Sequence, residues 1–296
     1  MLLAGVLAAA PMRAQELEPR ALSNAPVGTN FAVLASGYSR GNLLVDPALP
    51  LEDARADVWS VAAGFVHTIG VRGHVGRVGI SLPFVTGTWE ATLAGADTGT
   101  SRSGFADPQV QVGVNFVGAP ALTRTEFRNY VQKTVVGAQF AISVPIGQYD
   151  PDKLINLGSH RWAFHPRLGV SHVLGRRWAL EAYASAWLYT TNRDYYGGHV
   201  LEQDPFFDVQ GHAIYIIRMP DIWMAGSVGY GWGGAARIDG APKEALENMR
   251  ASAVLRFPLA RSHGLKLVYI NGLTTRLGGD FNTVQLAYQH AFGGRP

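Results

Sequence analysis

Apolar and polar residues alternate with a period of two along most of the chain, most clearly between residues 156 and 234. In the run 178–189, for example, Trp178, Leu180 and Leu188 alternate with Glu181 and Tyr183. A run of about ten residues with this period is a strand with one apolar and one polar face. Strands joined alternately by tight turns and long polar loops indicate a transmembrane β-barrel.

The same pattern predicts about twelve strands over the whole chain. We place them at 29–38, 57–68, 77–90, 109–116, 134–145, 162–174, 178–189, 207–217, 222–234, 248–259, 265–269 and 280–292. An even number of strands is typical of bacterial single-chain barrels. We therefore predict an all-β fold, an up-and-down antiparallel barrel with both termini in the periplasm.

The connections should divide between the two ends of the barrel. Short turns are expected near 70–76, 175–177, 219–221 and 261–263, and polar loops at 40–56, 91–106, 147–160 and 235–247. The segment 120–133 falls at the end with the short turns, where its length leaves room for a turn of helix. In the first strand, we expect Phe31, Val33 and Ala35 to form the apolar face.

The N-terminal residues divide into two predicted segments. Residues 1–14 form a short apolar stretch that predicts a secretory signal cleaved after Ala14, with a buried N-terminal helix as the alternative. Residues 15–28 are polar and contain proline, which predicts a periplasmic lead-in too short to plug a barrel. The barrel itself should occupy residues 29–296.

Composition favours a membrane protein over a soluble one. Charged residues make up 16% of the chain, against about a quarter in soluble domains. No apolar run approaches the roughly eighteen residues of a spanning helix, so a membrane location requires a closed barrel. The net charge is +3 with scattered basic residues, so nucleic acid is not an expected partner. The absence of cysteine excludes disulfides and thiolate zinc sites.

No pattern in the sequence predicts catalysis, a metal or a cofactor. Residues 229–234 satisfy G-x-G-x-x-G, but no helix follows to receive a pyrophosphate. Ser171 and His172 are adjacent, so on a strand their side chains point in opposite directions. The histidines lack the spacing of metal ligands. We therefore expect a protein that is not an enzyme.

The inward face of the predicted strands supplies the candidate lining of a solute path. This set comprises Arg77, Gln111, Asn115, Gln139, Arg167, Glu181, Tyr183, Trp187, Tyr189, Asp208, His212, Arg250 and Arg256. These residues either line a route for a solute or, as pairs, fill a narrow barrel. Tyr183, Trp187 and Tyr189 are the best candidates for stacking an aromatic ligand, with core filling as the alternative.

Another set of aromatic residues lies at predicted strand ends or on outward positions. Such residues typically anchor a barrel at the membrane interface. The predicted anchors are Trp59, Trp162, Trp178, Trp223 and Tyr288.

Several short motifs resemble the MetA-pathway of phenol degradation family of outer-membrane proteins. They occur in order along the chain at 23–31, 104–108, 145–150, 156–166, 191–195 and 203–205. The most specific is 156–166, which reads NLGSHRWAFHP. The resemblance implies an outer-membrane barrel associated with uptake of aromatic or apolar compounds, without an agreed set of functional residues.

These observations together predict a passive outer-membrane channel for small hydrophobic or aromatic molecules. The alternatives are a barrel enzyme acting on lipid, a structural barrel without transport, and a soluble lipocalin-like binder with the opposite orientation of faces. The expected partners are outer-membrane lipids, the solute and the barrel-assembly machinery. The identity of the solute, its axial or lateral route and the oligomeric state stay open.

Overall fold

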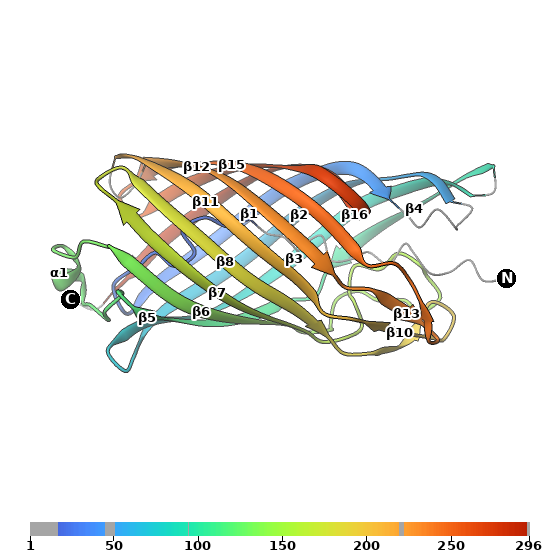
Figure 1. The fold of residues 1–296 in the computed structure, drawn as a ribbon, viewed down its shortest axis with the longest axis horizontal. Coiled ribbons are helices and arrows are strands. Elements are labelled where there is room, and N and C mark those ends of the chain that lie inside the picture. Colours follow the sequence, from blue (N-terminus) through green and yellow to red (C-terminus); the bar gives the residue numbers. More distant parts are fainter. Residues whose placement is uncertain (1–16, 45–50, 94, 219–221, 295–296) are drawn as a thin grey trace.

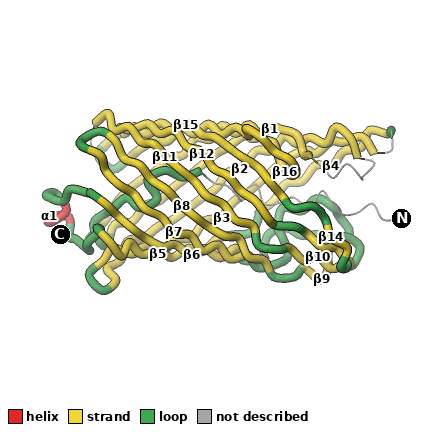
Figure 2. Tube along the Cα trace, viewed as in Figure 1, coloured by secondary structure: helices red, strands yellow, loops and turns green. Residues whose placement is uncertain are grey.

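A computed structural model describes residues 17–44, 51–93, 95–218 and 222–294 and shows a long antiparallel β-barrel (Figures 1 and 2). Its wall consists of β1 (Thr29–Leu44), β2 (Leu51–Val71), β3 (His74–Leu93), β4 (Ala96–Phe105), β5 (Gln109–Val117), β6 (Thr134–Ser143), β7 (Ala163–Leu174), β8 (Trp178–Tyr189), β11 (Phe206–Arg218), β12 (Ile222–Gly233), β15 (Leu246–Ala260) and β16 (His263–Gly293). Outside the wall lie α1 (Arg124–Phe127), β9 (Asn192–Tyr195), β10 (His199–Gln203), β13 (Ala236–Ile238) and β14 (Ala241–Pro242). In the described residues, no helix is long and apolar enough to cross a membrane.

The sheet contains twelve strands and closes on itself because β2 pairs with both β1 and β3. Two elements differ from simple strands. β4 and β5 pair with successive halves of β3, so together they form one interrupted strand. β16 pairs with β15 through its first half and with β1 through its second half, so it contributes two strands to the wall. The predicted twelve-stranded meander is confirmed.

The two ends of the barrel differ as the sequence predicts. One end carries α1 and tight turns, including the Arg72-Gly73 turn between β2 and β3, where both residues have positive φ. Positive φ at both central positions defines the hairpin turn that matches the twist of the strands. The other end carries the longer loops, with the β9–β10 hairpin and the β13–β14 hairpin (Figure 1). The predicted turn at 219–221 lies outside the described residues.

Thr29 at the start of β1 pairs with Gly293 at the end of β16. The first and the last residue of the barrel wall therefore lie at the same end of the barrel. The side chain of Arg124 in α1 lies beside Gly294, which places that helix at the same end. The helix begins with a capping box, in which Thr123 and Glu126 satisfy each other's backbone N–H groups. The segment 120–133 therefore holds the turn of helix for which its length leaves room.

Rows of large apolar side chains cover the outside of the wall. On β3, for example, Val78, Ile80, Leu82 and Phe84 are all exposed, as predicted. A soluble protein rarely exposes a continuous apolar surface of this kind. Since the strands alternate, the same pattern places polar residues inside. The surface is that of a barrel surrounded by lipid.

The first strand was assigned the wrong faces in the prediction. Leu34 and Tyr38 are 54% and 40% exposed and point outward, opposite Tyr288 and Trp59 on the neighbouring strands. Val33 faces the interior, on the same side as a Cβ atom added at Gly64, which would lie 3.8 Å from the Cβ of Val33. Both faces of this strand carry apolar residues, so the alternation alone could not distinguish inside from outside.

The prediction of polar loops was wrong in three regions. Residues 40–44 belong to β1 and residues 51–56 to β2 rather than to a loop. Residues 96–105 form β4 rather than part of a loop, because they extend the β3 hairpin beyond β5 and leave most of their side chains exposed. Small or polar residues occupy both faces of this strand up to Gly104, so the sequence shows no apolar alternation there. Residues 235–247 include β13, β14 and the start of β15.

Candidate functional site: the occupied lumen

The inward side chains of β8 and β11 meet in layers across the wall. Phe206 pairs with Trp187 near the loop end, followed by Asp208 with Ser185 and Gln210 with Tyr183. The next layer pairs His212 with Glu181, and the layer nearest the turn end is apolar, with Ile214 opposite Ala179. The lumen therefore changes from mixed aromatic and polar, through charged, to apolar along the barrel axis.

The charged layers form a connected polar network. The guanidinium of Arg167 lies 4.0 Å over the ring of Tyr183, and its Nη2 donates to Gln210 across 3.3 Å. The Tyr183 hydroxyl donates to Glu181 over 2.8 Å. Asp208 accepts hydrogen bonds from Ser185 and from Gln210. Such a network fixes its members, because breaking one bond leaves a polar group unpaired in a low-dielectric interior.

The structure places all thirteen predicted lining residues on inward positions, but it does not leave them equally free. Tyr183 is held by Arg167, Glu181 and an edge contact with His212. Trp187 stacks on His165 with ring centroids 4.0 Å apart. The remaining inward residues, placed by strand alternation, register and neighbouring contacts, are Arg77, Gln111, Asn115, Gln139, Tyr189, Arg250 and Arg256.

One predicted interface aromatic is on the wrong side of the wall. Trp223 is 6% exposed and packs in an interior cluster with Ile214, Ile216 and Val254. Trp223 pairs with Ile216, which places it on the inward face of β12. The other four predicted anchors, Trp59, Trp162, Trp178 and Tyr288, are exposed on the outside. The Gly-rich sequence of β12 carries aromatic residues on both faces. The alternation therefore does not distinguish its inward face from its outward face.

Residues 17–28 enter the lumen, and we call them the inner segment. The prediction that this stretch is too short to plug a barrel was wrong. Leu17 and Leu22 are buried at 3% and 1% exposure, and Leu22 belongs to an interior cluster with Val75, Val135 and Tyr183. A segment of this length suffices because a barrel of twelve strands leaves only a narrow interior.

Side chains of the wall hold the inner segment by its backbone. Arg77 donates to the carbonyl oxygens of Ala21 and Ser23, and Asn115 donates to that of Leu22 over 2.9 Å. Gln139 donates to the Ala21 carbonyl over 3.3 Å. These bonds recognise the main chain rather than side chains of the inner segment. Three predicted lining residues on β3, β5 and β6 therefore bind this protein's own chain, and Glu181 on β8 is a fourth.

The opposite wall completes the contacts of the inner segment. The backbone N–H of Arg20 donates to Glu181 over 2.6 Å, and Glu18 forms an ion pair with Lys266 at 3.5 Å. Leu17 packs against Gly229 of β12, where a Cβ atom would lie 2.7 Å from it. The inner segment thus touches β3, β5, β6, β8, β12 and β16, and it crosses the lumen from wall to wall.

Near Gly229, the wall is hollowed on its outer side. Val209, Gly211, Val228, Tyr230 and Met249 border a depression of about 200 Å³ on the outside of β11, β12 and β15. Gly211 and Gly229 lie in this stretch and add no side chain to the wall. Leu17 of the inner segment therefore packs on the inner side of the wall, directly behind the depression on the outer side.

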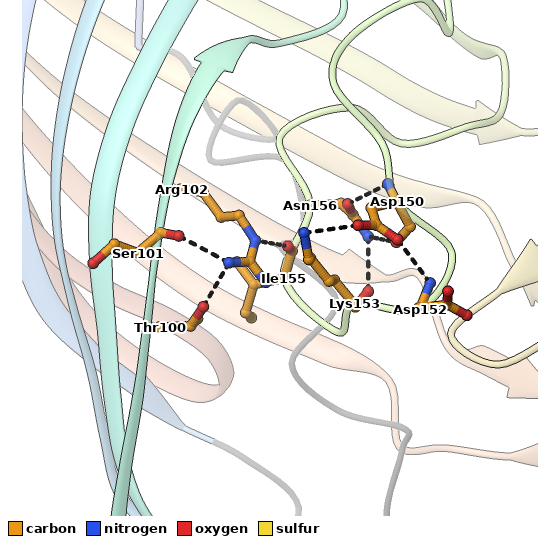
Figure 3. A network of polar contacts seen from close by, with 8 residues as sticks. All are labelled: Thr100, Ser101, Arg102, Asp150, Asp152, Lys153, Ile155 and Asn156. Carbon is orange, nitrogen blue, oxygen red and sulfur yellow. Dashed lines mark hydrogen bonds and ion pairs between the residues drawn. The ribbon is translucent and has the colours of Figure 1, made fainter.

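The loop before β7 lies at the other end of the barrel (Figure 1). Asp107 fixes it at two points, accepting from the N–H of Gly147 over 2.9 Å and from the N–H of Ser159 over 2.8 Å. Arg102 of β4 donates through Nε to the carbonyl of Ile155 over 2.9 Å (Figure 3). One edge of β4 pairs with β3, and the loop lies beside the other edge.

A cavity of about 270 Å³ lies between this loop and β4. Asn156 shapes the loop by bonding the N–H and carbonyl of Asp150 and the carbonyl of Lys153 (Figure 3). The hydrogen bond from Lys153 is the main reason that the pKa of Asp150 lies below its usual range. Arg102, Tyr149 and Leu157 complete a lining of mixed polar and apolar character.

Beside this cavity lies a buried arginine that sequence reasoning did not select. Arg161 is 7% exposed, and its guanidinium lies 4.4 Å over the ring of Tyr189. Burial lowers the pKa of Arg161. The 156–166 motif contained it, but nothing in the motif distinguished a buried cation from an exposed one. In the described residues, no three side chains of metal-ligating type gather into a metal site.

The fold and site define a membrane-type β-barrel with an apolar outside and a polar lumen that its own N-terminal chain occupies. Residues 34–255 match the family described as "Putative MetA-pathway of phenol degradation", and the chain belongs to that family. Among curated proteins, no relative matches the chain.

Solved structures share the fold. A crystal structure of an outer membrane channel from Pseudomonas putida F1 is 21% identical, with a TM-score of 0.78 over 94% of this chain and 100% of that one. The β domain of the Bordetella autotransporter BrkA is 13% identical, with a TM-score of 0.54 over 90% and 100%. The transport unit of the autotransporter AIDA-I from Escherichia coli is 10% identical, with a TM-score of 0.51 over 94% and 93%. The architecture is therefore that of bacterial outer-membrane barrels.

Proposed function

We propose that this protein resides in the bacterial outer membrane and passes small hydrophobic or aromatic molecules by passive diffusion. The observation that carries this proposal is the closed barrel with an apolar exterior and a polar, aromatic-containing lumen. Membership of a family named for phenol degradation supports aromatic compounds as the solute class. The channel from Pseudomonas putida F1 supports transport as the activity.

In this proposal, the solute enters between the loops and passes the aromatic layer before it reaches the inner segment. Trp187 and Phe206 form a buried aromatic cluster with Ala163 at the loop end, so the solute passes this layer only when these side chains move. The inner segment limits the rate because its contacts span the lumen. Passage requires this segment to shift, and its anchoring bonds are of about 1 kcal/mol each, which thermal motion can break. The implied partners are the solute, outer-membrane lipids and, during biogenesis, the barrel-assembly machinery.

Solute flux into liposomes that carry the refolded protein tests the proposal. Phenol and an aliphatic alcohol are compared with a small sugar and with ions. We expect phenol to enter faster than the sugar and Trp187→Ala to raise the phenol flux several-fold, because Trp187 is part of the buried aromatic layer that the solute must pass. Trp178→Ala is the matched control, since Trp178 is 48% exposed on the outer surface.

Other results would contradict the proposal in distinct ways. Equal passage of phenol, sugar and ions would indicate a general pore. No flux through a correctly folded barrel would favour a structural barrel, the second candidate. The specific observation that favours this second candidate is the inner segment, whose contacts cross the lumen.

A further inference from the structure

The guanidinium of Arg161 is buried, and among the described residues no carboxylate forms an ion pair with it. Its Nη2 donates to the side-chain oxygen of Gln203, and its Nη1 is buried with no hydrogen-bond partner in the described part of the chain. An unpaired buried charge is costly, so native proteins normally provide a carboxylate or another acceptor. The guanidinium of Arg161 can therefore donate a further hydrogen bond to an acceptor, at a position closed to bulk water.

Asp107 is a carboxylate whose charge acts on Arg161, but its oxygens already accept hydrogen bonds from other groups. One of its oxygens accepts from the N–H of Gly147, and the other accepts from both the N–H and the hydroxyl of Ser159. These bonds hold the loop before β7, so Asp107 cannot turn toward Arg161 without releasing the loop. Within the described ranges, Arg161 makes no ion pair.

Aromatic side chains surround this cation. Tyr189 lies under the guanidinium, and Trp187, in the next inward position of β8, is buried with Phe206 and Ala163. The hydroxyl of Tyr195 and the indole Nε1 of Trp187 are also buried without partners. Burial is the main reason that the pKa of Tyr195 rises to about 12, so this hydroxyl is a neutral donor. The cluster thus combines unused donors with flat apolar surfaces.

We propose that the Arg161 cluster binds an aromatic carboxylate. The carboxylate would accept from Arg161 and from the hydroxyl of Tyr195, in the planar geometry that favours pairs of arginine and carboxylate. The aromatic ring of the ligand would pack on the aromatic side chains around the guanidinium. This inference deepens the proposed function and rests on it, since it names a solute class for the same path.

The cavity between β4 and the loop provides the approach. Tyr149 lines that cavity, and its hydroxyl accepts over 3.0 Å from Asn192, the first residue of the β9 strand that ends at Tyr195. Tyr149 is also among the groups whose charge acts on Arg161. For a ligand in the cavity to reach the guanidinium, Tyr149 and its loop must move.

Calorimetric titration of the folded protein in detergent with benzoate tests this inference. We expect benzoate to bind more tightly than acetate or inorganic phosphate, which lack the aromatic ring. Benzoate should also bind more tightly than benzyl alcohol, which has the ring but no charge. Arg161→Gln should weaken benzoate binding at least about tenfold, the effect of losing a charged hydrogen-bond pair. Arg193→Gln is the matched control, because Arg193 is an exposed arginine of β9 at the same end.

Unchanged benzoate binding in Arg161→Gln would overturn the inference, as would acetate binding equal to benzoate. If Arg161→Gln lacks the heat-modifiable migration of a folded barrel, Arg161→Lys keeps the charge and removes the planar fork. We then expect weaker binding in Arg161→Lys, and unchanged binding would overturn the inference. Benzoate binding without any solute flux in liposomes would contradict the proposed function and leave the binding site intact.

Discussion

The side-chain amide of Asn115 on β5 donates a hydrogen bond to the carbonyl oxygen of Leu22, across 2.9 Å and 93 positions of sequence. This bond joins the barrel wall to the chain that precedes the first strand. Asn115 is 2% exposed, so the bond is made away from bulk water. With the bonds from Arg77, it shows that polar lining residues of this barrel hold an internal segment.

Filling the space beside Leu22 should loosen the inner segment. A Cβ atom at Gly137 would lie 2.8 Å from Leu22 and 2.6 Å from the Asn115 side-chain oxygen. We expect Gly137→Val to raise phenol flux several-fold in liposomes, because the segment must move. Gly226→Val is the matched control, since nothing lies within 4 Å of that position. Equal flux in the two variants would contradict the prediction.

Glu181 connects the inner segment to two strands of the wall. Its carboxylate accepts from the N–H of Arg20, the hydroxyl of Ser171 and the hydroxyl of Tyr183. Glu181→Ala would leave three donors without their acceptor in the interior. We expect a loss of about 3 kcal/mol in the free energy of unfolding, measured with urea in lipid vesicles. Glu181→Gln retains one acceptor oxygen, so its free energy of unfolding should fall by less. An equal fall in the two variants would show that these hydrogen bonds do not stabilise the fold.

Two tryptophans at the turn end should report opposite environments. Trp178 is exposed on the outside, whereas Trp223 is buried in the interior cluster. In single-tryptophan variants, lipids with brominated acyl chains should quench Trp178 strongly and Trp223 weakly, because quenching requires contact with the lipid. Strong quenching of Trp223 would show that it anchors the barrel as the sequence pattern predicted.

Removing Asp107 should release the loop before β7. Its carboxylate is the acceptor for Gly147 and Ser159, and the exposed Lys153 lies between them. We expect trypsin to cleave after Lys153 about tenfold faster in Asp107→Ala, since each lost bond is of about 1 kcal/mol or more. Asp152→Ala is the control within the same loop. Identical cleavage rates in the two variants would contradict this role of Asp107.

The sequence was sufficient to predict the class of fold, the strand number and most strand positions. Runs such as Val78 to Phe84 alternate cleanly because one face meets lipid and the other meets the lumen. The alternation failed where that contrast disappears. β4 carries small or polar residues on both faces, and the first strand carries apolar residues on both.

The internal arrangement could be predicted only in part. Inward positions followed from alternation, so Arg77, Asn115 and Gln139 were found. Their partner was not, because they bind backbone carbonyls of residues 21–23, and a backbone carbonyl carries no sequence signal. Arg161 was missed because its burial depends on a loop that folds inward, and periodicity describes strands only.

Single-channel conductance in planar bilayers tests the central claim most directly, namely that the protein is a channel whose lumen is occupied by its inner segment. The full chain is compared with a variant that lacks residues 17–27, both checked for heat-modifiable migration. We predict a conductance several-fold higher in the shortened variant, because contacts with six wall strands are removed. Equal conductance in the two proteins, or none in either, would contradict the claim.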